Sequence, residues 1–141
     1  MDRNIIILAG GASSRMKRSV EANSNVDAAL AREVLSKSKA MLGIGEGARP
    51  FLDYLLHNVE KAGYENVLIV VGDKEKSIRD YYEKDRAAEQ FPRLKFSYVP
   101  QIIPEGRSKP LGTADALRQA LKASSSWKGQ RFTVCNSDNL Y

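Results

Sequence analysis

The sequence predicts an α/β fold in which helices cover a mainly parallel sheet. Short apolar runs alternate with amphipathic stretches along the 141 residues, as expected for parallel strands joined by right-handed crossover helices. The first run, Asn4 to Ala9, has no alternation of polar and apolar residues, so we expect a strand that is buried on both faces. Polar segments follow this run and the last one, at the edge where such sheets bind ligands.

The first half of the chain contains both weak and strong signals. Residues 19–25 are rich in serine and asparagine and predict a mobile loop, while residues 26–37 predict a weakly amphipathic helix suited to a lid. Residues 43–47 predict a reverse turn. Proline is favoured in the first turn of a helix, so Pro50 and the apolar stripe after it predict a helix that ends at Gly63.

The second half of the chain supplies three further strands and two helices. Apolar residues 67–71 predict a second buried strand, and residues 95–99 alternate as they do near a sheet edge. Helices are predicted at 75–84 and 113–123, and a fourth strand at 131–136. The apolar face of the 113–123 helix is predicted to consist of Ala114, Leu117 and Leu121.

Composition and charge restrict the function classes. A content of 43% hydrophobic and 28% charged residues is ordinary for one soluble domain, and no apolar run is long enough to cross a membrane. The single cysteine, Cys135, excludes an internal disulfide and fits a cytoplasmic protein, with the thiol in the core. The net charge of +5 indicates an anionic partner. Because the cations are scattered and not interleaved with aromatic residues, we expect a phosphate-rich small molecule and no nucleic acid.

The segment after the first strand has the composition of an anion site. Gly10 and Gly11 let the backbone turn sharply and approach a ligand, and free N–H groups there lie next to Arg15 and Lys17. The spacing is neither that of dinucleotide-binding loops nor that of P-loops. A site for phosphates is therefore expected at this turn.

This glycine turn resembles the signature of sugar-1-phosphate nucleotidylyltransferases, which Leu8, Ala9, Gly10, Gly11 and Arg15 match. Ser13 and Ser14 stand where that family usually has glycine and threonine. Further segments resemble family motifs in the same order: Lys39 after Ser38, Arg49-Pro50, Pro110 to Leu117, and Asn136-Ser137-Asp138. The resemblance covers nearly the whole chain. It implies a Rossmann-like, three-layer αβα fold of the nucleotide-diphospho-sugar transferase type.

The resemblance implies a role for each matching residue. Arg15 and Lys39 are the expected catalytic residues, with Arg15 on the leaving pyrophosphate and Lys39 on the α-phosphate or the incoming phosphate. Asp138 is the expected ligand of Mg²⁺, the implied cofactor. The nucleotide is expected to contact Leu8, Ala9, Gly10, Gly11, Gln101, Gly112 and Thr113, with Gln101 at the edge of the base.

Simpler roles remain open for several of these residues. Lys39 and Gln101 are equally well interpreted as exposed polar residues. For Asp138 the simpler role is the cap of a turn, although its place after a strand favours metal ligation. Asp115 fits the first turn of a helix through the macrodipole alone. Two loop cations are alternative phosphate contacts: Arg107 and Lys109.

The implied activity is transfer of a nucleoside monophosphate from a nucleoside triphosphate to a sugar 1-phosphate, with release of pyrophosphate. Molybdenum-cofactor nucleotidyl transfer is an alternative, because Ser13-Ser14-Arg15-Met16 also resembles those enzymes. A regulatory nucleotide-binding module without catalysis and a basic nucleic-acid-binding domain are alternatives from other classes.

Residues 1–141 are expected to form the nucleotide-binding half of such a domain, because the family's catalytic domain continues past this length. We therefore expect an incomplete fold, a strand order of three-two-one-four and no transferase activity of the chain by itself. The strand at 131–136 then lies at an edge without cover, which favours a homo-oligomer.

Overall fold

The main sheet has four strands, and all of its pairings are parallel. The computed structural model describes residues 3–11 and 13–141. The strands are β1 (Asn4–Ala9), β4 (Asn66–Gly72), β5 (Lys95–Gln101) and β6 (Thr133–Asn136). They lie in the order β5-β4-β1-β6, which confirms both the predicted α/β class and the predicted strand order.

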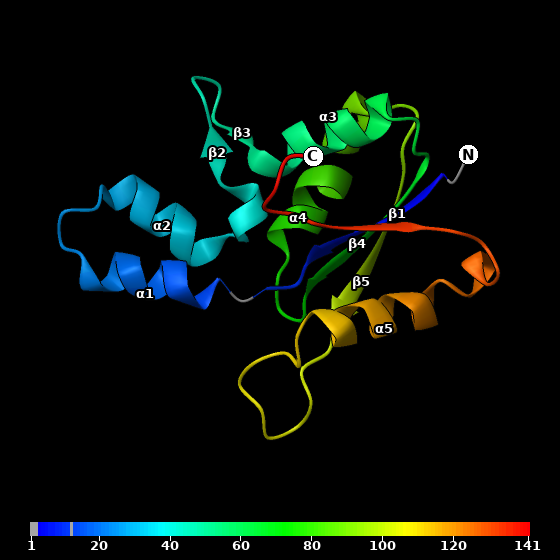
Figure 1. Ribbon diagram of the computed structural model, residues 1–141. Helices are drawn as coiled ribbons and strands as arrows, with labels where there is room; N and C mark the ends of the chain where they lie inside the picture. The colour runs from blue at the N-terminus through cyan, green and yellow to red at the C-terminus, as the bar shows by residue number, and fades with distance from the viewer. Residues whose placement is uncertain (1–2, 12) are drawn as a thin grey trace.

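Helices cover the sheet on both faces (Figure 1). One face carries α3 (Phe51–Lys61), α4 (Ser77–Arg79), the π-helical turn η2 (Asp80–Lys84) and the 3-10 helix η3 (Ala87–Gln90). The other face carries α5 (Thr113–Ala123), which the short 3-10 helix η4 (Ser125–Trp127) follows. The fold is therefore the expected three-layer αβα arrangement.

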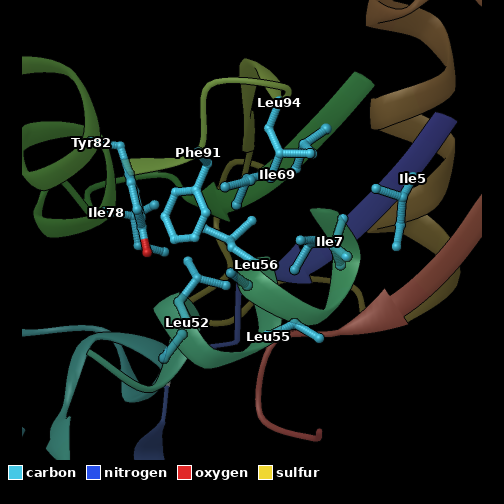
Figure 2. Close-up of a cluster of buried hydrophobic side chains, with 14 of the residues drawn as sticks. Ile5, Ile7, Leu52, Leu55, Leu56, Ile69, Ile78, Tyr82, Phe91 and Leu94 are labelled. Atoms are coloured by element: carbon cyan, nitrogen blue, oxygen red, sulfur yellow. The ribbon is translucent and has the colours of Figure 1, made fainter. Parts of the chain in front are cut away.

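Strand β1 is buried on both faces, which explains its unbroken apolar sequence. Ile5 and Ile7 belong to the larger cluster, which packs against α3, whereas Ile6 belongs to the smaller cluster beneath α5. Ile6 and Ile7 are 0% exposed. Figure 2 shows the larger cluster, in which Ile7 lies close to the leucines of α3. Packing on both sides fixes the strand that leads into the glycine turn.

Strands β5 and β6 form the two edges of the sheet, and each pairs with one strand only. Strand β5 extends to Gln101, two residues further than predicted, and contains Pro100, a residue that sheets tolerate at an edge. Strand β6 forms the other edge, where Val134 is 38% exposed and Cys135 is buried. Pairing of this edge with a second chain stays a prediction.

The predicted loop at 19–25 is wrong over its first residues, because α1 (Ser14–Ala22) runs through them. Helix α1 packs against α2 (Ala28–Ser36), and the two lie beside each other away from the sheet (Figure 1). Asp27 caps α2, since its Oδ2 accepts a 3.2 Å hydrogen bond from the N–H of Leu30. The helix predicted at 26–37 is confirmed in these slightly narrower bounds, and its role as a lid stays a prediction.

Turn residues near the middle of the chain behave as expected. The 3-10 helix η1 (Lys39–Met41) leads into a hairpin of β2 (Gly43–Ile44) and β3 (Arg49–Pro50), whose turn is closed by a bond from Ala48 N–H to Gly45 O. Helix α3 starts directly after Pro50. It ends before Gly63, whose φ of 89° is the left-handed conformation that glycine adopts most readily.

The face that α5 buries differs from the prediction. Ala116 and Ala120 pack on the sheet, while Ala114 is exposed and Leu121 is 39% exposed. Small side chains at positions four residues apart let the helix lie close to the sheet, so the larger Leu121 is rotated toward solvent. Of the three residues predicted for the buried face, Leu117 alone packs against the smaller cluster, and it is half-buried.

A buried carboxylate anchors α3 to the helical segment after β4. Asp53 is 1% exposed and accepts hydrogen bonds from the hydroxyls of Tyr82 at 2.7 Å and Tyr81 at 3.2 Å. The guanidinium of Arg49 lies 3.5 Å from the same carboxylate. Burial, with the neighbouring carboxylate, raises the pKa of the Tyr82 hydroxyl, so it remains a donor at all ordinary pH values.

No helix in the described part of the chain combines the length and the apolar character needed to cross a membrane.

We predict that Ile7→Ala destabilises the chain far more than Ile44→Ala. Ile7 is 0% exposed and Ile44 is 45% exposed, so the same truncation leaves a cavity only at Ile7. Loss of a buried isoleucine side chain lowers the free energy of unfolding by about 2–5 kcal/mol, and an exposed one changes it by less than about 0.5 kcal/mol. Urea denaturation measures both values. Equal losses would contradict the two-sided packing of β1.

We also predict that Cys135 reacts slowly in the folded chain. Burial raises the pKa of the thiol to about 11, so at pH 8 only about one thiol in a thousand is the reactive thiolate. Alkylation by iodoacetamide, followed by mass spectrometry, should be at least roughly 100-fold slower in buffer than in guanidinium chloride. The native rate should rise about tenfold per pH unit up to the raised pKa. Labelling at the same rate in both conditions would contradict the burial of this thiol.

Candidate active site

One pocket of about 690 Å³ opens at the carboxyl ends of β1, β5 and β6. All of the residues to which the resemblance assigns a role line it, although they come from separate segments. These are Leu8, Ala9, Gly10, Gly11, Arg15, Lys39, Gln101, Gly112, Thr113 and Asp138. The fold thus brings the predicted set together, while the role of each residue remains a prediction.

The turn after β1 allows close approach between two segments. A side-chain Cβ at Gly10 would lie 2.8 Å from Oε1 of Gln101, too close for any other residue at this position without displacing that amide. A Cβ at Gly11 would meet nothing within 4 Å, so this backbone faces open space at the pocket. Gly10 therefore serves the contact with Gln101, whereas Gly11 leaves room for a ligand.

Ser13 adopts a conformation that explains the glycine usual at this place in the resembling family. Its φ of 51° and ψ of 27° lie in the left-handed region, which a serine occupies at some cost. The chain leaves this residue directly into α1, with Arg15 in the first turn. The strained turn aims the start of the helix at the pocket. Ala12 lies outside the described residues.

Arg15 is exposed at the pocket and takes part in no ion pair among residues 3–11 and 13–141. Its planar guanidinium presents several N–H donors in a fork that matches two phosphate oxygens. An exposed, unneutralised arginine beside a backbone turn can therefore receive a phosphate without first breaking an ion pair.

Lys39 and Asp138 form an ion pair across the pocket, with 3.0 Å between Nζ and Oδ2. Their side chains are 53% and 42% exposed, so solvent screens the pair and its contribution to stability is small. The predicted phosphate contact and the predicted metal ligand thus neutralise each other in the absence of ligands. This contact also shows that Lys39 is directed toward the site.

Gln101 is buried, and its interpretation as an exposed polar residue is wrong. It is 3% exposed, and its Nε2 donates to Gly112 O at 3.0 Å and to Asp115 Oδ2 at 3.3 Å. These bonds join the end of β5 to the first turn of α5 across the intervening loop. The loop that separates Gln101 from Gly112 in sequence does not separate them in space.

Asp115 is the residue that sequence reasoning missed. It lies in the first turn of α5, as the macrodipole interpretation expects, but its carboxylate also accepts bonds from Gln101, Arg118 and Gln119. The hydrogen bond from Arg118, followed by that from Gln101, holds the pKa of this carboxyl below its usual range. The sequence signal was an acid with arginine three residues later, the spacing of neighbours on one helix face.

A second pocket of about 540 Å³ adjoins the first at the Gly10–Gly11 turn, which lines both. Lys17 and Arg107 line it, while Lys109 lines neither of these two pockets. The positive charges of this pocket are nearly balanced by negative ones. Its lining contains four basic residues, Lys17, Lys37, Lys74 and Arg107, and three acidic residues, Asp73, Glu75 and Glu105. Arg107 is therefore not brought to the same pocket as Arg15 and Lys39.

The donors around the first pocket suit a cation that is held partly by phosphate. Among the described residues there is no group of three or more His, Cys, Asp or Glu side chains arranged around a metal site. Mg²⁺ commonly takes one or two carboxylates and completes its shell with phosphate oxygens and water. The half-exposed carboxylate of Asp138 at the pocket fits that mode.

Comparison with known proteins identifies a matching family. The model of the MobA-like NTP transferase domain matches residues 5–140. Curated relatives include the bifunctional protein GlmU of Staphylococcus epidermidis, which is 25% identical over 140 residues that cover 99% of this chain and 23% of that protein. The match confirms the nucleotidylyltransferase family that the motifs predicted.

Solved structures with the same fold include two of one enzyme. UDP-glucose pyrophosphorylase from Acinetobacter baumannii has a TM-score of 0.64 at 18% identity, over 99% of this chain and 47% of that chain. The UTP-bound UGPase from Acinetobacter baumannii has a TM-score of 0.65 at 18% identity, over 98% and 46%. The chain thus spans about half the length of these structures and about a quarter of GlmU.

Proposed function

This chain belongs to the family of MobA-like NTP transferase domains, and we propose that it is the nucleotide-binding half of a sugar-1-phosphate nucleotidylyltransferase. One observation carries the proposal. Residues from four separate segments that resemble family motifs line one pocket at the carboxyl end of the parallel sheet, together with Gln101. The substrates are a nucleoside triphosphate and a sugar 1-phosphate.

The reaction needs positioning and charge stabilisation more than covalent chemistry. A phosphate oxygen of the sugar 1-phosphate attacks the α-phosphorus, the bond to the bridging α–β oxygen breaks, and pyrophosphate leaves with that oxygen. Arg15 holds the departing pyrophosphate, and Lys39 stabilises charge on the α-phosphate or the incoming phosphate. The backbone of Gly10 and Gly11 receives the nucleotide, and Gln101, Gly112 and Thr113 lie where its base would bind.

Asp138 is the proposed Mg²⁺ ligand. When bound, Mg²⁺ neutralises negative charge on the phosphoryl oxygens. The ammonium of Lys39 lies against Oδ2 of Asp138, so its positive charge opposes binding of Mg²⁺ to this carboxylate, and the lysine is free for phosphate only when it turns away from Asp138. Binding of the metal and use of Lys39 are therefore coupled in this site.

Molybdenum-cofactor nucleotidyl transfer is a second candidate. The turn sequence Ser13-Ser14-Arg15-Met16 favours it. The helical pair α1–α2, which separates Lys17 from Lys39, and the Gly112 to Leu117 segment favour the sugar-phosphate enzymes.

We predict that a nucleoside triphosphate with Mg²⁺ raises the melting temperature of the chain, and that Arg15→Ala removes most of this effect. A ligand at a hundredfold excess over its Kd stabilises the folded state by about 2.7 kcal/mol. Thermal melts with dTTP, UTP, CTP, GTP and ATP measure the effect. Arg32→Ala is the matched control, because Arg32 is exposed on α2 and lines neither pocket.

Absence of a shift with every triphosphate would contradict the nucleotide site. An equal loss in both arginine variants would contradict the role of Arg15. Release of pyrophosphate in the presence of a sugar 1-phosphate, measured on the longest natural form of the protein, distinguishes an enzyme from a binding module.

We predict opposite effects of Lys39→Ala on two ligands. Removing the lysine frees Asp138, so Mg²⁺ alone should bind about 1.5- to 5-fold more tightly, as expected for loss of an exposed ion pair. The complex of Mg²⁺ with a nucleoside triphosphate should bind more weakly, because a phosphate contact is lost. Isothermal titration measures both affinities. Lys84→Ala, which breaks an exposed ion pair with Asp80 outside the site, is the control. Changes in the same direction for both ligands would contradict the coupling.

A further inference from the structure

The amide of Gln101 is held by groups that can only accept hydrogen bonds. Its Nε2 donates to the backbone oxygen of Gly112 and to Oδ2 of Asp115. A carbonyl oxygen and an ionised carboxylate offer no proton, so a reversed amide would place its own oxygen against two other oxygens. The amide orientation is therefore determined by these two neighbours.

Asp115 is itself held in place from the far side. Arg118 donates to its Oδ1 through Nε at 3.2 Å and through Nη2 at 2.6 Å, and Gln119 donates to its Oδ2 at 2.7 Å. Gln119 also bonds both the N–H and the carbonyl of Ile102, the residue after Gln101. The charge of Arg118 keeps the carboxyl ionised, because the pKa of Asp115 is lowered chiefly by this hydrogen bond.

The other end of the Gln101 amide remains available. Within the described part of the chain no donor is bonded to Oε1, and this atom is not among the fully buried polar atoms that lack a partner. It lies beside Gly10, where a Cβ would approach it to 2.8 Å, and Gln101 lines the candidate site. A carbonyl oxygen with an unused lone pair thus lies beside the glycine turn of the candidate site.

We propose that Asp115 is a positioning residue that fixes the Gln101 amide so that its carbonyl oxygen, and not its NH₂ group, faces the nucleobase. This inference rests on the proposed nucleotide site. A base that presents an N–H to this oxygen is favoured over a base that presents only an acceptor there, because two facing acceptors leave both unpaired. Asp115 thereby contributes to base selection without touching the nucleotide.

The orientation is tested first without any ligand. In ¹H–¹⁵N spectra of the whole chain, the side-chain NH₂ of Gln101 should be shifted from those of exposed glutamines and protected from exchange with solvent. Asp115→Asn keeps the shape but replaces one acceptor with a possible donor, and Asp115→Ala removes the partner. Both variants should move these resonances and speed exchange, with Asp115→Ala the larger effect. Glu46→Ala, which removes an exposed carboxylate outside the pocket, should change neither.

Base selection is tested by titrating UTP, dTTP, CTP, GTP, ATP and inorganic tripolyphosphate. In both Asp115 variants the ratio between the weakest and tightest nucleotide Kd should fall by roughly 3- to 10-fold, the value of about one hydrogen bond. Tripolyphosphate has no base, so its affinity should stay the same. A parent chain that binds triphosphates without discriminating between bases, or variants that retain the parent ratio, would overturn the inference. A loss shared equally by tripolyphosphate would also overturn it, because it indicates general damage to the site.

Failure of the proposed function looks different. If no triphosphate binds the parent chain, the nucleotide site is wrong, and the spectra of Gln101 then decide the positioning role by themselves. Unchanged Gln101 resonances in Asp115→Ala would overturn that role regardless of any binding result.

Discussion

The candidate site depends on the burial of β1 on both faces up to the point where its turn must open to a ligand. Ile5 and Ile7 on one face and Ile6 on the other leave the strand no freedom to shift within the sheet. The pairings with β4 and β6 hold its backbone from both sides. The turn at Gly10 and Gly11 therefore begins from a rigid base, as the proposed phosphate site requires, because groups held in place beforehand need little further ordering on binding.

Order at the other side of the pocket comes from polar contacts, because β5 is an edge strand and has a hydrogen-bonded neighbour on one side only. Gln101, the last residue of β5, is bonded by Asp115 of α5, and Ile102, the first residue after the strand, is bonded by Gln119. These bonds hold the end of β5 beside Gly10. The close approach of Gln101 to Gly10 then joins the two halves of the pocket, so a change in α5 is felt at the glycine turn.

The charges of the site are arranged unequally. Lys39 and Asp138 neutralise each other, whereas Arg15 has no ion-pair partner among the described residues. The site therefore has an excess of positive charge near α1 and a balanced pair opposite it. For the function proposed above, this arrangement leaves Arg15 ready for an anionic ligand, while the Lys39–Asp138 pair is weak enough to exchange its partners because solvent screens it.

Hydrophobic periodicity and turn residues are local signals, and by themselves they determined the strands and the bounds of α3 between Pro50 and Gly63. They also determined which segments meet at the pocket. The tertiary structure decided what depends on contacts between distant residues. Helix α1 is polar and lacks a side-chain cap, so its sequence gives little sign of a helix. In the fold it packs against α2. Two small residues of α5, Ala116 and Ala120, face the sheet in place of the larger Leu121, and only the packed structure shows this choice. Gln101 can be buried because Asp115, fourteen residues later, accepts a hydrogen bond from its side-chain NH₂ group. Such a bond is invisible in sequence, because its free energy exists only once the fold has removed both groups from water.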